Sequence, residues 1–358
     1  MAPSVTEPKF VHADGAALEA ISDAVDNVNK LKGLLAAAAE SKRKKLLHGD
    51  EVKVLMDDDN RLKEEEKHSL EVHDITLDDN EVPFDAESKF DCGKDKTLFR
   101  QYAMATEQVK GFYKEQHEKH TVAYNLAARK RFSDPSRVRM EMGIWEAMEK
   151  LNTLIDESDP DTTLTQIQHL LQSAEAIRRD GKPRWMQVTG LVHDLGKLML
   201  FFEGQLCSSQ WDVVGDTFPV GCAWQETNIF HEYFASNPDT NDKVYSTRQG
   251  MYKPKCGINN LMMSWGHDEF LYLVLKDQSR LPKEALAMIR FHSFYPWHFG
   301  DGYKELMADG DEELLRAVRA FNPYDLYSKR DGVPDVEELK PYYMDLIDEF
   351  FPQKILKW

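Results

Sequence analysis

The residues best suited to chemistry lie in the run Leu191–Lys197, where His193 directly precedes Asp194. An imidazole beside a carboxylate suits metal binding, because the Asp can bridge two metal ions while the His binds one of them. Further His and Asp residues before and after this pair complete a set of nitrogen and oxygen donors: His169, His193, Asp194, His267, His292 and Asp325. These residue types indicate a site that holds two metal ions.

The donor types narrow the choice of metal. Imidazole with carboxylate and no sulfur suits iron, manganese or zinc rather than copper(I), and it is too rich in nitrogen for magnesium alone. The cysteines show no CxxC spacing, so they predict neither a zinc knuckle nor a disulfide framework. A single buried histidine is more often a hydrogen-bonded core residue than a ligand, so the prediction rests on the whole set.

Two amphipathic segments would position the first donors. The pattern Thr163-Leu164-Thr165-Gln166 resembles a capping box, which predicts a helix start and places His169 one turn inside the helix. In the following segment, apolar residues recur at steps of three and four: Trp185, Val188, Val192, Leu195 and Met199. At about 100° per residue, the opposite face carries Gly190, His193, Asp194 and Lys197. We therefore expect one buried helix whose polar face lines an internal cavity.

Beyond about residue 90, periodic segments follow one another with few strand-like alternations, so the main body is predicted to be all-α. Further helices are expected at 267–276, 282–292, 311–320 and 342–351, and Pro282 would lie in the first turn of the second. Pro296 and Pro323 are expected at helix ends. Among the other histidines, His298 has apolar neighbours, whereas five lie in charged stretches: His48, His68, His73, His117 and His120.

The N-terminal region, residues 1–90, differs from the body in composition. Residues 16–47 have the spacing of an amphipathic helix, and residues 49–80 are charged and free of aromatic side chains. A flexible extension without a catalytic role is the favoured interpretation. The alternatives are a helix that mediates association with a partner and a nuclear address at Lys42–Lys45. The catalytic domain is predicted to span residues 91–358 and to be monomeric.

Composition excludes several functions. The chain has 358 residues, 42% of them hydrophobic, and a formal net charge of −17. This charge argues against binding to nucleic acid phosphates and to anionic membrane surfaces. No apolar run approaches the roughly 18 residues of a membrane span, and the first residues lack the pattern of a signal peptide. A cytoplasmic protein without nucleic-acid or membrane partners is expected.

The order of the candidate ligands resembles that of the HD-domain superfamily of helical metalloproteins. Longer strings resemble signature segments of the myo-inositol oxygenase family: Ile155–Asp161, Val213–Cys222, Met263–Glu269, Ile289–His298, Phe321–Tyr327 and Pro341–Tyr343. The resemblance extends from about Leu98 to Trp358. The N-terminal extension and a longer connection at 203–210 depart from the family pattern, and they could alter the pocket entrance or regulation.

This resemblance implies an all-α, HD-domain-like helical bundle around a di-iron site. Asp194 would bridge the two irons. One iron would bind His169, His193 and Asp325. The other would bind His267 and His292, with open positions for substrate oxygens, as an oxygen-activating site requires.

The resemblance also implies which residues contact the substrate. Lys197 and Asp194 would be the catalytic residues. The substrate-binding set would be Arg100, Asp156, Glu157, Ser158, Asp159, Lys197, Gly215, Asp216, His292, Ser293 and Lys329. Arg100 and Lys329 are expected to close the pocket as a lid, with a surface salt bridge as the alternative. For Asp156, helix capping or a turn is the alternative.

The implied activity is that of an oxidoreductase. It would cleave the ring of myo-inositol between C1 and C6, with O2 as co-substrate and mixed-valent Fe(II)/Fe(III) as cofactor. The product would be D-glucuronate, in the first step of inositol catabolism, and no organic cofactor is expected. The first alternative is a metal-dependent phosphohydrolase, the activity of most HD-domain proteins. The second is a metal-stabilised binding module whose N-terminal helix is the working part.

Overall fold

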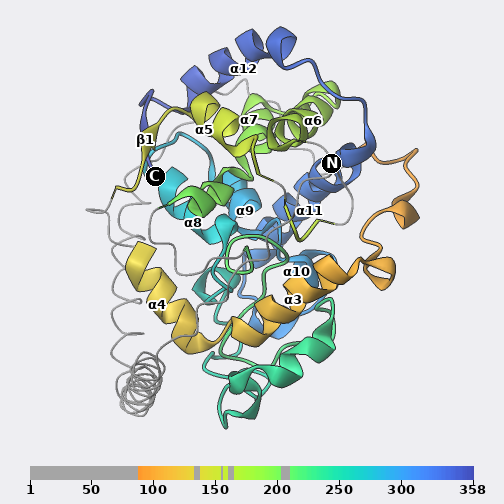
Figure 1. Ribbon diagram of the computed structural model, residues 1–358, viewed down its shortest axis with the longest axis vertical. Coiled ribbons are helices and arrows are strands. Elements are labelled where there is room, and N and C mark those ends of the chain that lie inside the picture. The colour runs from red at the N-terminus through yellow and green to blue at the C-terminus, as the bar shows by residue number, and fades with distance from the viewer. Residues whose placement is uncertain (1–87, 133–137, 155, 160–164, 203–209) are drawn as a thin grey trace, which may run out of the picture. The chain divides into compact units, whose positions relative to one another are not determined.

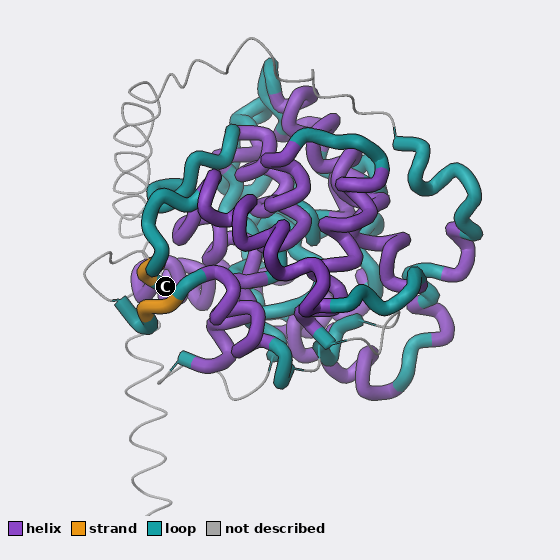
Figure 2. Tube along the Cα trace, turned by 90° about the horizontal axis from the view of Figure 1, so that it is seen from above, coloured by secondary structure: helices purple, strands orange, loops and turns teal. Residues whose placement is uncertain are grey.

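The computed structural model describes residues 88–132, 138–154, 156–159, 165–202 and 210–358. The predicted N-terminal helix, the charged stretch and most of the connection at 203–210 lie outside these residues. Figures 1 and 2 show that helices form most of the described chain, with two short strands near the C-terminus. The predicted all-α class is therefore confirmed. In the described part, every helix is too short or too polar to cross a membrane.

Helical segments of two kinds and one pair of strands make up the regular structure of the described residues. The α-helices of the described residues are α3 (Glu107–Lys119), α4 (Val122–Phe132), α5 (Ile144–Leu151), α6 (Gln166–Arg179), α7 (Arg184–Val192), α8 (His267–Leu275), α9 (Lys283–Phe291), α10 (Tyr295–His298), α11 (Asp311–Tyr327) and α12 (Val336–Phe350). Short 3₁₀ segments are η1 (Lys96–Leu98), η2 (Tyr102–Met104), η3 (Leu195–Phe201), η4 (His231–Ser236), η5 (Pro238–Asn241), η6 (Ile258–Asn260), η7 (Lys304–Leu306) and η8 (Ser328–Arg330). The strands β1 (Glu141–Met142) and β2 (Leu356–Lys357) pair antiparallel.

Five helices form the frame that carries the candidate ligands. Helix α6 packs along α7 and against α11, while α9 packs against α7, α8 and α11 (Figure 1). Gly190 permits the close approach of α6 and α7, because a Cβ at this position would lie 2.7 Å from Ile177 Cδ1. Gly190 thus belongs to a helix contact and not to the predicted polar face. The frame buries a continuous apolar core that includes Leu170, Val188, Leu271, Met288 and Phe321.

The predicted single helix around His193 is wrong in one respect. The α-helix ends at Val192, His193 is its C-cap, and a 3₁₀ segment begins at Leu195. Gly196 shows the physical reason, because a Cβ there would lie only 2.0 Å from the carbonyl oxygen of His267. The tighter winding brings η3 directly against the start of α8, a tertiary contact that the apolar period does not encode.

The predicted start of α6 is early by two residues. Thr165 is the N-cap, and its backbone N–H donates to Gln168 Oε1 at 3.2 Å. The Thr-x-x-Gln pattern occurs twice in this segment, from Thr163 and from Thr165, and the second copy opens the helix. His169 still lies one turn inside, as predicted.

One of the two prolines expected at helix ends is not there. Pro323 lies inside α11, which continues to Tyr327, whereas Pro296 follows the end of α9 and lies at the start of α10. An interior proline costs a helix about 3 kcal/mol. Phe321 and Tyr324 on either side of Pro323 are fully buried, and this packing keeps the chain helical through the proline. Pro282 is the N-cap of α9 and so precedes its first turn.

His117 and His120 lie in a charged stretch of sequence, yet both are buried. His117 stacks on Phe234 with ring centroids 3.9 Å apart, and its Nε2 lies 2.9 Å from the carbonyl oxygen of Ile229. His120 Nε2 lies 3.3 Å from the carbonyl oxygen of Trp211. The charged neighbours of these histidines lie on the exposed side of α3. The local composition therefore does not show that the histidines, on the inner side, are buried.

Candidate metal centre

Four side chains form what we call the first cluster: His169, His193, Asp194 and Asp325. The Nε2 atoms of His169 and His193 lie 3.2 and 3.4 Å from Asp325 Oδ1. The same two nitrogens lie 3.6 and 3.7 Å from Asp194 Oδ2. Donor atoms of His169, His193 and Asp194 fall within 4.8 Å of one another, so this group could hold a metal ion.

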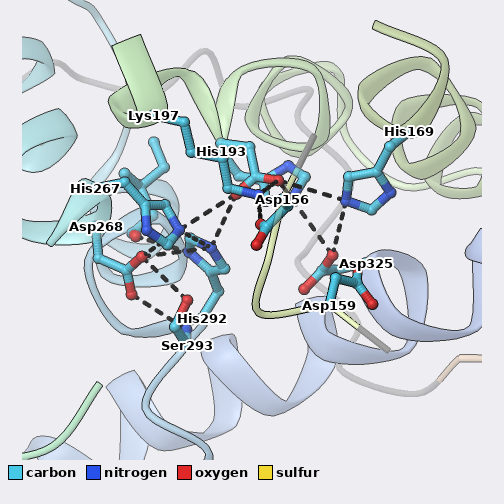
Figure 3. A network of polar contacts seen from close by, with 12 residues as sticks. Asp156, Asp159, His169, His193, Lys197, His267, Asp268, His292, Ser293 and Asp325 are labelled. Atoms are coloured by element: carbon cyan, nitrogen blue, oxygen red, sulfur yellow. Dashed lines mark hydrogen bonds and ion pairs between the residues drawn. The ribbon is translucent and has the colours of Figure 1, made fainter. Parts of the chain in front are cut away.

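The second cluster contains His267, His292 and again Asp194. The two Nε2 atoms are 3.2 Å apart and lie 3.3 and 3.6 Å from Asp194 Oδ1. These donors also fall within 4.8 Å of one another. Asp194 therefore offers one carboxylate oxygen to each cluster, which is the geometry of a bridging carboxylate. Figure 3 shows the labelled imidazoles around this point, with the second cluster on one side and His169 with Asp325 on the other.

Each candidate ligand comes from the end or the last turn of an element, apart from His169. His193 is the C-cap of α7, Asp194 precedes η3, and His267 is the first residue of α8. His292 is the C-cap of α9, while Asp325 lies near the end of α11. Helix ends release side chains from the regular spiral, so donors from different helices can converge on one point.

Hydrogen bonds at Nδ1 orient three of the imidazoles. His193 Nδ1 lies 2.9 Å from Gly190 O, His267 Nδ1 lies 2.7 Å from Val213 O, and His292 Nδ1 lies 2.9 Å from Ile289 O. A carbonyl oxygen only accepts, so each Nδ1 carries the proton and donates it. Each Nε2 then faces carboxylate oxygens, and such a buried contact requires a proton or a metal ion between nitrogen and oxygen. This donor set therefore fits a metal ion.

The charges of the site agree with this orientation. Burial alone would raise the pKa of Asp194, but Lys197 and His193 hold it well below its usual range. Burial likewise acts against the charged form of His267, yet Asp268 and Asp194 raise its pKa to about 10. In the absence of a metal, the carboxylates thus hold a proton on the nitrogen that would bind one. Proton and metal compete for the same position.

A cavity of about 60 Å³ adjoins both clusters. Its lining contains ten of the eleven predicted substrate-binding residues: Arg100, Asp156, Ser158, Asp159, Lys197, Gly215, Asp216, His292, Ser293 and Lys329. Glu157 is not among the lining residues, and its backbone N–H donates to Gln210 Oε1 at 3.1 Å. One water needs roughly 10–15 Å³, so the cavity suits a compact polar ligand.

Every cationic side chain of the cavity lining is already paired with a carboxylate. Lys197 Nζ lies 2.8 Å from both Asp156 Oδ2 and Asp194 Oδ2, and these two carboxylates raise its pKa although burial opposes this. Asp156 also makes the turn considered as its alternative role, because Oδ1 accepts from the Ser158 backbone N–H and hydroxyl at 2.9 and 2.6 Å. Asp156 therefore makes the turn and also lines the cavity, and its role in substrate binding stays a prediction.

Arg100 and Lys329 lie in the cavity wall. The Arg100 guanidinium forms two bonds of 3.1 and 2.6 Å to Asp216, and its Cζ lies 3.5 Å from the Tyr295 ring centroid. Lys329 Nζ lies 2.7 Å from Asp159 Oδ2. Both pairs are largely buried, so neither is a surface salt bridge.

The structure adds residues that the sequence argument missed. Tyr102, Tyr113, Tyr295 and Leu326 also line the cavity. Asp268 lies behind the second cluster, with Oδ1 2.8 Å from His267 Nε2. Its position directly after a candidate ligand, as in the His193-Asp194 pair, is a signal in the sequence that makes it a candidate, although only the structure shows where its carboxylate lies.

Comparison with known proteins gives a consistent answer. The family model described as myo-inositol oxygenase matches residues 106–358. An inositol oxygenase of Dictyostelium discoideum is 46% identical over 288 residues, covering 78% of this chain and 97% of that protein. Inositol oxygenase 4 of Arabidopsis thaliana is 49% identical, with 73% and 82% covered, and the Homo sapiens inositol oxygenase is 44% identical, with 74% and 92% covered. The chain belongs to the myo-inositol oxygenase family.

Proposed function

We propose that this protein is a di-iron oxygenase that cleaves myo-inositol between C1 and C6. Myo-inositol and O2 would give D-glucuronate and water, so that one oxygen atom enters the product. The four electrons that reduce O2 come from the substrate, which removes the need for an organic cofactor. Residues 91–358 would form the catalytic domain.

The arrangement of Asp194 is the observation that carries the proposal. Its two oxygens face two separate groups of imidazole nitrogens, which fits a pair of bridged metal ions. Nitrogen and oxygen donors of this kind suit iron in a mixed-valent Fe(II)/Fe(III) pair. When bound, the irons would supply Lewis acidity and the electron transfer that activates O2.

The protein's own groups would then hold and polarise the substrate. A buried hydroxyl without a partner costs about 1–3 kcal/mol, so a hexol needs many donors and acceptors. Asp156, Ser158, Asp159, Asp216 and Ser293 supply them around the cavity. Lys197 remains an ammonium between Asp156 and Asp194, and it would stabilise negative charge on a substrate oxygen in the cavity.

The pairing of the cavity cations disfavours phosphohydrolase activity. Arg100, Lys197 and Lys329 each contact a carboxylate of the same cavity. A phosphate group would have to displace those carboxylates or bury its charge beside them, which is costly. A neutral polyol can instead add hydrogen bonds to the existing pairs.

The test is an assay of the iron-loaded, partly reduced protein with myo-inositol under air. D-glucuronate formation and O2 uptake are followed together, and equal molar amounts are expected. A protein that binds two metals, forms no D-glucuronate and releases phosphate from phosphate esters would instead belong to the hydrolytic branch.

A further inference from the structure

Asp268 is the second residue of α8, directly after His267, and it is buried. Its Oδ1 lies 2.8 Å from His267 Nε2 and 3.5 Å from His292 Nε2. The same oxygen accepts from the Ser293 hydroxyl at 3.1 Å, while Oδ2 accepts from the Ser293 backbone N–H at 3.2 Å. Figure 3 shows this carboxylate between the labelled His267, His292 and Ser293.

The charge of Asp268 is balanced differently from that of its neighbours. The next residue, Glu269, contacts Arg129 and Arg290, and the cavity carboxylates Asp159 and Asp216 each contact a lysine or an arginine. In the described part of the chain, Asp268 forms ion pairs with imidazoles alone. A buried carboxylate is stable only beside positive charge. Here that charge must come from protonated imidazoles or from a metal ion.

The contacts of Asp268 repeat those of Asp325 in the first cluster. Asp325 Oδ1 lies 3.2 and 3.4 Å from two imidazole Nε2 atoms, and Asp268 Oδ1 lies 2.8 and 3.5 Å from the two of the second cluster. With Asp194 shared, each cluster then has two imidazoles and two carboxylates. The two positions are thus matched in charge.

We propose that Asp268 is the positioning residue of the second cluster, where its carboxylate supplies the second negative charge facing His267 and His292 and holds the Ser293 hydroxyl in the cavity wall. This inference rests on the metal centre proposed above. It assigns Asp268 two separable effects: metal affinity through charge at the imidazoles, and substrate affinity through Ser293.

The test compares Asp268→Asn, Ser293→Ala and wild type as metal-free full-length proteins titrated anaerobically with Fe(II). Loss of a group that orients metal ligands costs about 10–100-fold in affinity. Asp268→Asn should therefore bind one Fe(II) as wild type does and the second about 10–100-fold more weakly. Ser293→Ala keeps the carboxylate, so it should bind both ions and show only a raised KM for myo-inositol.

The matched control is Asp159→Asn, which removes a cavity carboxylate that pairs with Lys329 instead of the imidazoles. It should bind both Fe(II) ions like wild type. Equal affinity for the second ion in Asp268→Asn and wild type would overturn the proposal, as would an equal loss in Asp159→Asn. Fewer than two ions in wild type would instead refute the metal centre itself, so the two failures are distinguishable.

A variant that preserves charge keeps the test decisive if Asp268→Asn does not fold. Asp268→Glu retains a carboxylate near the imidazoles but shifts its contacts with Ser293. Two bound Fe(II) ions with a raised KM would support the proposal. Loss of the second ion in Asp268→Glu, with the first retained, would show that a nearby negative charge is not what this position requires.

Discussion

Asp194 and Lys197 are joined by a contact of 2.8 Å between Asp194 Oδ2 and the lysine ammonium, at the start of η3. The same oxygen faces the first cluster, and Lys197 also lines the cavity. This relationship couples the proposed bridging ligand to the proposed substrate site. It also allows the two roles to be separated by mutation.

Replacing Asp194 with Ala should remove both metal ions, because the two clusters share this carboxylate. Metal analysis after gel filtration checks the prediction, and the expected content is below one ion per chain. Retention of two ions by Asp194→Ala would show that the bridging assignment is wrong.

Replacing Lys197 with Met keeps the aliphatic stem and removes the ammonium. Both ions should remain bound, while kcat falls about 10²–10³-fold, the usual cost of a lost electrostatic group in an active site. Steady-state kinetics beside metal analysis separates this variant from Asp194→Ala. A normal kcat in the fully loaded Lys197→Met protein would exclude a catalytic role for the ammonium.

Glu269 ties three helices together. Its carboxylate contacts Arg129 of α4 and Arg290 of α9, with three bonds of 2.8–3.0 Å. Glu269→Gln would remove the carboxylate charge that faces both guanidinium groups, which costs about 3–5 kcal/mol and lowers Tm by roughly 5–10 °C in a chain of this size. The control is Asp301→Asn, which alters an exposed pair with Arg319 and should barely change Tm. Calorimetry of both variants makes the comparison.

Burial of His117 and His120 predicts a loss of stability in acid. Burial lowers the pKa of His117 to about 3 and that of His120 to about 4, against about 6.5 in the unfolded chain. The unfolded state therefore binds more protons below pH 6.5. The stability contribution is full above that pH and is lost as pH falls toward 4 and then 3.

At pH 5 each of these two histidines should lower the free energy of unfolding by about 2 kcal/mol relative to neutral pH. His117→Gln removes one titrating group. Between pH 7 and pH 5, the free energy of unfolding of this variant should therefore fall by about 2 kcal/mol less than that of wild type. Urea denaturation at the two pH values measures it. Parallel pH dependence of the two proteins would mean that His117 takes up its proton as readily in the folded state as in the unfolded chain.

The sequence predicted part of the fold through the periodicity of its apolar residues, and part of the site through the order of its His and Asp residues. Regular apolar spacing identified the segments of α6 through α9, and the order of His and Asp residues identified the donors that the structure brings together. Features that depend on contacts between distant segments could not be predicted from the sequence. Phe321 and Tyr324 keep α11 helical through Pro323 by packing, and the ring on which His117 stacks, that of Phe234, lies more than a hundred positions away in the chain.

Asp268 was missed for a related reason. Its neighbour His267 marked the position, but the sequence could not show which way the carboxylate points. In the structure it faces two imidazoles, one of them from α9. Glu269, one residue on, faces two arginines instead. Only packing distinguishes these adjacent acidic residues.

Gly196 is predicted to be essential for the site because of space. A Cβ there would lie 2.0 Å from the His267 carbonyl oxygen, so Gly196→Ala must displace η3 from the start of α8. We expect a lower Tm together with weaker binding of the metal ion at the second cluster. The control is Gly111→Ala in α3, where nothing lies within 4 Å of the added Cβ, and alanine should favour the helix by up to about 1 kcal/mol. Scanning calorimetry and metal analysis of both variants decide the matter: wild-type behaviour of Gly196→Ala would show that the contact between η3 and α8 does not position His267.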